Sequence, residues 1–149
     1  MSSTLSDEDQ LRRLITEMQM LQNTSEVLQQ RFNLLESAMT ELQVSGNTLQ
    51  ELKKENEGAS LLVPLGSGSF IRTKLGDIRT IIVGIGADVS VEMELDKALD
   101  DYGTRMSEME KASLSVQEQL SQILAQSESH QNNINRLSAK LQQEGKLGV

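Results

Sequence analysis

A block of 34 residues, 59–92, separates two long stretches of helix-forming composition and limits how this chain can fold. The block holds five of the ten glycines and the only proline, Pro64. On both sides of it the chain is rich in Leu, Met, Gln, Glu and Ser, a composition that favours helices. The sequence therefore predicts an α+β chain in which two long helices are joined by one small unit of β-structure.

The β-forming block repeats itself at an offset of 20 residues. Leu-Val-Pro-Leu-Gly-Ser-Gly at 62–68 aligns with Ile-Val-Gly-Ile-Gly-Ala-Asp at 82–88. Each copy consists of an apolar run, a three-residue turn that contains glycine (66–68 and 86–88) and a second alternating run, which is typical of a β-hairpin. The block is thus expected to form two hairpins in tandem, at about 59–93.

Two further residues of the block fit this arrangement. Gly76 and Asp77 supply a turn between the hairpins. Pro64 cannot donate a ladder hydrogen bond, so it suits an edge or a bulge. A pair of two-stranded ribbons is unstable alone, so we expect the apolar side chains of the block to contact other subunits. The predicted oligomer interface consists of Val63, Leu65, Ile71, Ile81, Val83, Ile85, Val89 and Val91.

The first helix is expected at about 6–57, with Ser6 as its cap and Glu57-Gly58 as its end. Alternating steps of three and four residues give Leu11, Leu14, Met18, Leu21, Ser25, Leu28, Phe32, Leu35, Met39, Leu42, Gly46 and Leu49, of which ten are apolar. This spacing predicts the seam of a left-handed coiled coil. A second line at the c positions of the same heptads, Met20, Val27 and Leu34, favours an exposed apolar strip.

The second helix is expected at about 94–144, with Gly145 after its last turn. The same steps give Leu95, Leu99, Tyr102, Met106, Met109, Ser113, Val116, Leu120, Ile123, Ser127, His130, Ile134, Leu137 and Leu141, of which eleven are apolar. Two helices of similar length joined by a compact block pair with each other only if they are antiparallel. Residues that face each other should then have numbers that sum to about 150. The numbers of Gly46 and Gly103 sum to 149, and those of Ser25 and Ser127 sum to 152.

Composition excludes several classes of protein. The net charge of −8 repels nucleic-acid phosphates and anionic membrane surfaces. Cysteine is absent, so neither disulfides nor thiolate metal sites can form. No stretch has the length and hydrophobicity of a membrane span, and the first thirty residues lack the apolar core of a signal peptide. We therefore expect a cytoplasmic protein of one domain, 1–149, without nucleic-acid or membrane partners.

No arrangement of residues indicates an active site, so we expect neither enzymatic activity nor a metal or cofactor. His130 is the only histidine and occupies a seam position, where a structural or tuning role is favoured over catalysis. The glycine-rich segments 66–69 and 84–86 lack the Gly-Lys-Ser/Thr ending of a phosphate loop and do not open a helix. Acidic pairs such as Asp100-Asp101 are typical of a solvated helix face.

The order of a long helix, the two glycine-centred hairpins and a long return helix resembles prefoldin over essentially the whole chain. Two hairpins, at 61–75 and 80–93, are similar to the α class of subunit, whereas the β class has one. The resemblance implies a hexamer of two α and four β subunits, with a β-barrel platform and projecting coiled coils. It also implies an ATP-independent chaperone that captures unfolded client proteins at the coiled-coil tips and delivers them to a group II chaperonin.

Several apolar residues near the free ends of the helices are candidate client contacts, although packing in the seam explains Leu11, Leu14 and Leu137 at least as well. The candidates are Leu11, Leu14, Ile15, Met18, Met20, Leu137, Leu141 and Leu147. Several tips that act together would hold a client more firmly than any single contact. The alternatives are a tethering protein, in which the coiled coil is a spacer and the β block a dimerisation clip, and, more remotely, a coiled-coil arm without its parent enzyme.

Overall fold

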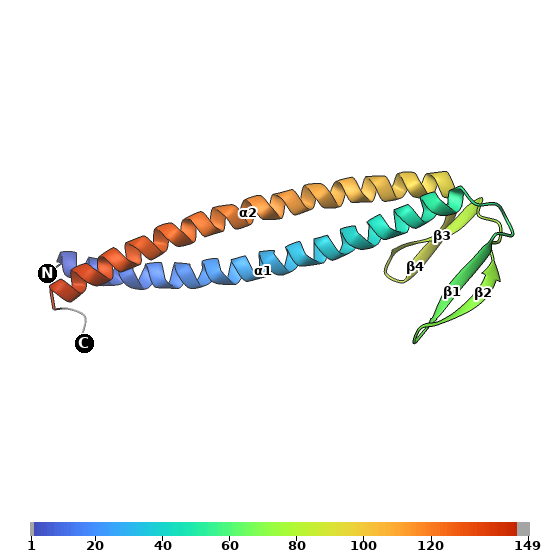
Figure 1. The fold of residues 1–149 in the computed structure, drawn as a ribbon. Coiled ribbons are helices and arrows are strands. Elements are labelled where there is room, and N and C mark those ends of the chain that lie inside the picture. Colours follow the sequence, from blue (N-terminus) through green and yellow to red (C-terminus); the bar gives the residue numbers. More distant parts are fainter. Residues whose placement is uncertain (1, 146–149) are drawn as a thin grey trace. The chain divides into compact units, whose positions relative to one another are not determined.

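The computed structural model describes residues 2–145 (Figure 1). The elements follow in the order α1 (Ser2–Lys53), β1 (Ser60–Gly66), β2 (Ser69–Lys74), β3 (Thr80–Gly86), β4 (Val89–Glu94) and α2 (Leu95–Gln143). The predicted α+β fold, with two long helices and two hairpins between them, is confirmed. The chain divides into two compact units, which we call the terminal unit (2–36 and 111–145 of the described residues) and the hairpin unit (37–110).

The first helix is displaced from its predicted limits at both ends. It begins at Ser2, so Ser6 lies within the helix and is not its cap. It ends at Lys53, four residues before the predicted end, because the next two N–H groups donate to carbonyl groups three residues back. The chain then turns at Gly58, whose φ of +88° is readily adopted only by glycine.

The second helix ends close to the predicted position. Its last residue is Gln143, and the N–H of Gly145 donates to the carbonyl oxygen of Gln142 at 3.0 Å. Gly145 has a φ of +69°, the left-handed conformation that commonly follows the last turn of a helix. The predicted role of this glycine is therefore confirmed.

The coiled-coil seam is confirmed in both helices. Every seam residue predicted between Leu11 and Leu49, and between Leu95 and Leu141, is buried or half-buried. In the terminal unit, side-chain contacts join Asp7 with Lys140 and Glu17 with His130, whose numbers each sum to 147, and Glu36 with Ser113, whose numbers sum to 149.

The hairpin unit has the same helix register, because Lys53 pairs with Asp96 at 2.7 Å and the two numbers sum to 149. A nearly constant sum requires antiparallel helices. The numbers of Gly46 and Gly103 also sum to 149, so this register agrees with the predicted proximity of the two glycines, although Gly103 is exposed and its neighbour Tyr102 occupies the seam position.

The two hairpins form separate two-stranded antiparallel sheets, β1 with β2 and β3 with β4. The turns differ from the prediction, because each loop has two residues rather than three. Gly66 pairs with Ser69, and Gly86 pairs with Val89. The loop residues are Ser67-Gly68 and Ala87-Asp88, all with positive φ, which is characteristic of the type I′ turn that matches strand twist.

A bulge precedes each turn, because the register shifts between Pro64 and Gly66 in β1 and between Gly84 and Gly86 in β3. The placement of Pro64 beside a bulge is therefore confirmed. Between the hairpins, the carboxylate of Asp77 accepts hydrogen bonds from the backbone N–H of Arg79 at 2.9 Å and from its guanidinium. The hydrogen bond from the guanidinium has the largest effect on the pKa of Asp77, and this bond and the backbone bond both lower it. The two bonds stabilise the segment between the hairpins.

Each unit has its own apolar core. In the terminal unit, Leu11, Leu137 and Leu141 are buried and are joined by the half-buried Leu14 and Ile134. In the hairpin unit, Leu49, Val83 and Ala98 are buried and are surrounded by Ile81, Met93, Leu99 and Tyr102. The second core joins both helices to β3 and β4, so it fixes the second hairpin against the helices of the hairpin unit.

Candidate binding surfaces

One face of the second hairpin belongs to the core of the chain itself. Val83 is 0% exposed and packs with Leu49 and Ala98. Ile81 and Val91 are half-buried on the same face, since Val83 pairs with Val91 across the ribbon. We predicted that these three side chains would be exposed in a single chain, and this was wrong because the helices cover them. The opposite face carries Ile82, which is 77% exposed.

A polar contact also holds the second hairpin on α2. The guanidinium of Arg105 donates to the carbonyl oxygen of Gly84 at 3.0 Å. Its Nη2 lies 2.8 Å from Asp101 Oδ2, at angles outside hydrogen-bond geometry, and its Cζ lies 5.9 Å from the ring centroid of Tyr102. Arg105 thus joins the backbone of β3 to one turn of α2.

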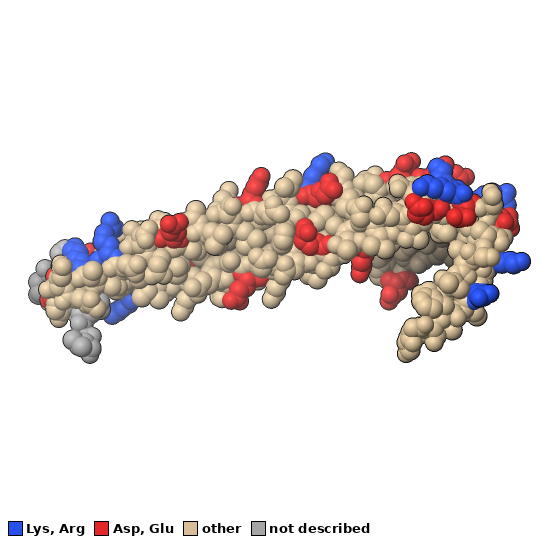
Figure 2. Space-filling model, in the orientation of Figure 1, with Lys and Arg blue, Asp and Glu red and all other residues tan. Residues whose placement is uncertain are grey.

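The first hairpin leaves apolar side chains exposed on both faces. Because residues alternate along a strand, Leu62 and Phe70 lie on one face, and the cross-strand pair Val63 and Ile71 lies on the other. The exposed fractions are 64% for Leu62, 59% for Phe70, 42% for Val63, 51% for Ile71 and 66% for Leu65. Residues 61–71 contain no charged side chain, and the turn end of this hairpin shows no charge on the face in Figure 2.

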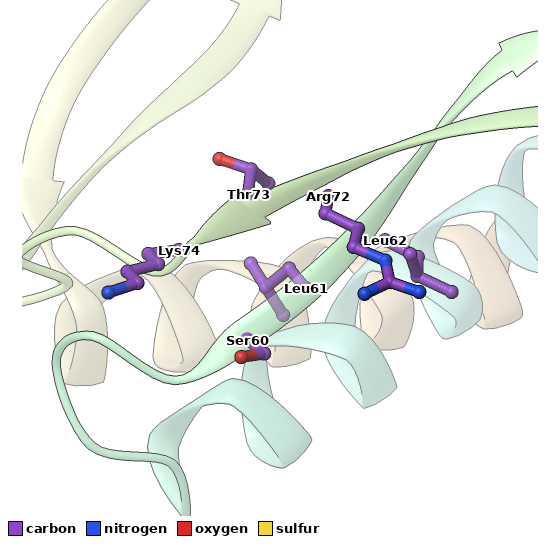
Figure 3. A pocket seen from close by; sticks show the side chains of 6 residues that line it. All are labelled: Ser60, Leu61, Leu62, Arg72, Thr73 and Lys74. Carbon is purple, nitrogen blue, oxygen red and sulfur yellow. The ribbon is translucent and has the colours of Figure 1, made fainter.

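The base of the first hairpin is more polar than its turn end. A pocket of about 540 Å³ lies here, lined by Ser60, Leu61 and Leu62 from β1 and by Arg72, Thr73 and Lys74 from β2. Figure 3 shows these six side chains. Arg72 is the cross-strand partner of Leu62, and its side chain lies beside that leucine. An apolar surface with a basic border at its base suits contact with another polypeptide.

The hairpins also have free backbone edges. Each described sheet has only two strands, so neither ribbon has a neighbouring strand along its outer edges. Ile85 and Val89, beside the second turn, are 49% and 50% exposed. Of the eight predicted interface residues, five are therefore accessible to another subunit: Val63, Leu65, Ile71, Ile85 and Val89.

The predicted client contacts fall into two groups in the terminal unit. Leu11, Leu137 and Leu141 are buried in its core, and Leu14 and Met18 are half-buried. Ile15 and Met20 are exposed, at 44% and 63%. Leu147 lies outside the described residues. The structure thus brings Leu11, Leu14, Leu137 and Leu141 together in one cluster and places Ile15 and Met20 on the surface.

The apolar strip at the c positions of α1 faces solvent. Met20, Val27 and Leu34 are 63%, 63% and 73% exposed, although each lies within two residues of a seam position. Leu114 and Leu124 on α2 are 59% and 64% exposed and were not predicted from the sequence. Each of these leucines directly follows a seam residue, and the residue type alone could have marked them as candidates.

A polar layer interrupts the seam of the terminal unit. His130 Nε2 lies 2.8 Å from Glu17 Oε2, and His130 Nδ1 lies 2.8 Å from the carbonyl oxygen of Gln126. The hydrogen bond to Glu17, followed by that to Gln126, raises the pKa of His130 above its ordinary value of 6.5. The same bond, followed by that from Arg13, lowers the pKa of Glu17.

The described residues show neither a metal-binding cluster nor a membrane-spanning helix. Residues 2–145 contain no group of three or more His, Asp or Glu side chains that could hold a metal ion. Within the same part of the chain, neither helix combines the length and the hydrophobicity that crossing a membrane requires. The candidate binding surfaces described above are the exposed hairpin residues and the exposed side chains of the coiled coil.

Comparison with known proteins agrees with this architecture. The prefoldin subunit family model matches residues 21–140. Prefoldin subunit alpha of Methanopyrus kandleri is 36% identical over 113 residues, which cover 76% of this chain and 72% of that protein. Prefoldin subunit alpha of Pyrococcus horikoshii is 35% identical over 115 residues, which cover 76% and 78%.

A solved structure shows the same fold. Filamentous PFD from Methanocaldococcus jannaschii, determined by cryo-EM, matches with a TM-score of 0.64 and 23% identity, covering 79% of this chain and 95% of that one. This chain belongs to the prefoldin family and is a subunit of the archaeal α type. It is therefore a chaperone subunit that works in an oligomer, and the tethering alternative is set aside.

Proposed function

We propose that this subunit captures non-native proteins through the coiled coil of its terminal unit, without ATP. The proposal rests on the exposed line of Met20, Val27 and Leu34, which the seam does not use. Each such side chain contributes roughly 1.5 to 3 kcal/mol when it is fully buried against a client. One coiled coil therefore holds an unfolded chain weakly, and several coiled coils in one assembly hold it by avidity.

The assembly that we propose is a cytoplasmic hexamer of two α and four β-class subunits, which delivers clients to a group II chaperonin. The exposed apolar residues of the first hairpin and the open edges of both ribbons support contacts with neighbouring subunits. Ile15 belongs to the proposed client surface together with the c-position line. Leu11, Leu14, Met18, Leu137 and Leu141 join it when the end of the coiled coil opens, and Leu147 is included as a proposal from sequence.

The test compares two triple variants of the full chain, each co-expressed with β-class subunits. Met20, Val27 and Leu34 are replaced by Ser in the first. The control replaces Thr16, Asn23 and Gln30, which are exposed at the same seven-residue spacing, by Ser. We expect the first variant to suppress aggregation of an unfolded protein less well, at unchanged helix content and assembly mass. Equal suppression by both variants would refute a client surface at these residues.

A truncation tests the contribution of the ends of the helices. Deleting residues 1–15 and 138–149 removes Leu11, Leu14, Ile15, Leu141 and Leu147, and we expect an intact assembly that protects clients poorly. Addition of a group II chaperonin to the client-loaded assembly then tests delivery, since transferred client should co-migrate with the chaperonin. Full protection by the truncated assembly would place capture elsewhere on the chain.

A further inference from the structure

A hydrogen bond between Glu17 of α1 and His130 of α2 joins the two helices. His130 is the only histidine of the chain. His130 occupies a seam position of α2, where the register places Met18 opposite it. Its side chain is 23% exposed and that of Glu17 is 40% exposed. The pair therefore lies at the border of the seam, where solvent protons reach it.

Both ring nitrogens of His130 face oxygen atoms. Nδ1 faces the carbonyl oxygen of Gln126 and Nε2 faces the carboxylate of Glu17, each at 2.8 Å. An imidazolium donates from both nitrogens and satisfies both contacts. A neutral imidazole has one N–H, so one nitrogen lone pair would be directed at an oxygen. The geometry thus favours the protonated ring.

Loss of the proton would weaken the link between the helices, because the ion pair loses its positive charge and a single N–H must serve two oxygen atoms. Among described residues, the charged group that contacts His130 is Glu17 on α1, and Arg13 Nε donates to the other carboxylate oxygen of Glu17 at 3.2 Å. Arg13 and Glu17 lie on the same helix, so their bond remains when His130 is neutral. The contact that joins α1 to α2 is the one that loses its charge assistance with the proton.

The surroundings of the pair favour local opening. A groove of about 390 Å³ lies beside it, lined by Glu17, Met20, Leu21, Thr24, Gln126 and His130, so solvent reaches the pair at this layer. The next layers toward the start of α1 and the end of α2 hold the core cluster of Leu11, Leu14, Ile134, Leu137 and Leu141. A break at His130 would separate this cluster from the rest of the seam.

We propose that Glu17 and His130 form a proton-dependent clasp, which holds the end of the coiled coil closed when His130 is charged and lets it open when His130 is neutral. Opening would expose the buried leucines of the end cluster. The clasp is a property of this chain alone and does not depend on client capture.

The direction of the pH effect follows from both groups. The raised pKa of His130 means that its contribution is complete below the ordinary value of 6.5 and is lost as pH rises through the raised value. The lowered pKa of Glu17 means that its contribution is present above 4.5 and is lost as pH falls through the lowered value. The clasp is therefore strongest between pH 4.5 and 6.5 and loosens on the alkaline side.

Hydrogen exchange of the full chain, corrected for intrinsic rates, tests the clasp at pH 6 and pH 8.5. We expect protection of amides in 11–21 and 130–141 to fall by about two- to threefold at the higher pH, as suits a partly exposed pair. Glu17→Gln should abolish this difference. Glu128→Gln, which removes a carboxylate that does not contact the ring, should retain it.

NMR titration of the single histidine provides a second readout, because Glu17→Gln should lower the pKa of His130 while Glu128→Gln should leave it close to that of the unmodified chain. Three outcomes would overturn the proposal. In the first, the unmodified chain is equally protected at both pH values. In the second, Glu17→Gln keeps the full pH dependence of the unmodified chain. In the third, Glu17→Gln loses the same amount of protection at both pH values, which would indicate a bond without a switch.

Discussion

The guanidinium of Arg105 on α2 donates a hydrogen bond of 3.0 Å to the backbone carbonyl oxygen of Gly84 in β3. The carbonyl lies next to the bulge that precedes the second turn. Since the core contact through Val83 lies one residue away, the hairpin is held at adjacent positions by one apolar and one polar contact. The orientation of this ribbon therefore depends on a helix residue outside the β block.

Replacing Arg105 by Met should loosen the second hairpin while α2 stays helical, because the charged hydrogen bond is lost and the aliphatic stem is kept. We expect the free energy of unfolding to fall by about 1.5 kcal/mol, the lower end of the range for a hydrogen bond that involves a charged group. Hydrogen exchange should report faster exchange in β3 and β4. Arg136→Met, at an exposed position of α2, is the control. Unchanged exchange in both strands would contradict a positioning role.

Two neighbouring residues of β3 should respond to substitution in different ways. Val83→Ala removes buried methyl groups and should destabilise the chain by about 2 kcal/mol in thermal unfolding. Ile82→Ser changes a side chain that is 77% exposed and should alter the stability of the isolated chain by less than about 0.5 kcal/mol.

Substitutions at the same two residues, Ile82 and Val83, distinguish effects on folding from effects on assembly. Ile82→Asp should reduce the mass of the assembly in light scattering, since an unpaired charge in an apolar interface is costly. Val83→Asp would damage the core of the chain, so it cannot report on assembly alone. An assembly of normal mass with Asp at position 82 would exclude this face of β3 from the subunit interface.

The glycines of β3 provide a test of the turn. Gly86 has a φ of +107°, whereas Gly84 has no positive φ, and a Cβ at either position would meet no atom within 4 Å. Gly86→Ala should therefore destabilise the chain by about 1 kcal/mol through backbone strain alone, and Gly84→Ala should change its stability little. Thermal unfolding of the two variants measures the difference. Equal stability would mean that the backbone at position 86 relaxes into an ordinary conformation.

The helices and the seam could be predicted from sequence because their signals are local. A spacing of 3.5 residues identifies the buried face of a helix without knowledge of its partner, and all predicted seam positions are buried or half-buried. The ends of α1 were predicted less well. The signals at Ser6 and Glu57-Gly58 are possible boundaries, but the helix continues through the first and ends before the second.

The exposed face of the second hairpin could not be predicted from sequence. Alternation identifies two faces of a ribbon, and in β3 both carry large apolar residues, Ile82 on one and Val83 on the other. Which face becomes exposed depends on where Leu49 and Ala98 of the helices lie, and this is a tertiary contact. The pair of Glu17 and His130 also depends on the register of the helices, although the sequence did mark His130 as the unusual seam residue.

The helix register leads to a final prediction about cross-linking. We predicted from sequence that Ser25 faces Ser127, whose numbers sum to 152. The pairs observed in the terminal unit sum to 147 or 149, so the residue opposite Ser25 is Ile123. Leu11 nevertheless shares a cluster with Leu137 and with Leu141, so a diagonal neighbour lies within reach of a side chain. Ser25 can thus approach both Ile123 and Ser127, but it does so at different frequencies.

Cysteines provide the measurement, because the natural chain contains none. Under mild oxidation, the variant with Ser25→Cys and Ile123→Cys should form a disulfide within one chain faster than the variant with Ser25→Cys and Ser127→Cys, since a disulfide requires Cα atoms about 5.5 to 6 Å apart. Gel mobility after denaturation distinguishes cross-links within and between chains. Faster closure of the Ser127 variant would show that the helices are shifted by one turn from this register, and cross-links only between chains would exclude the antiparallel hairpin of helices.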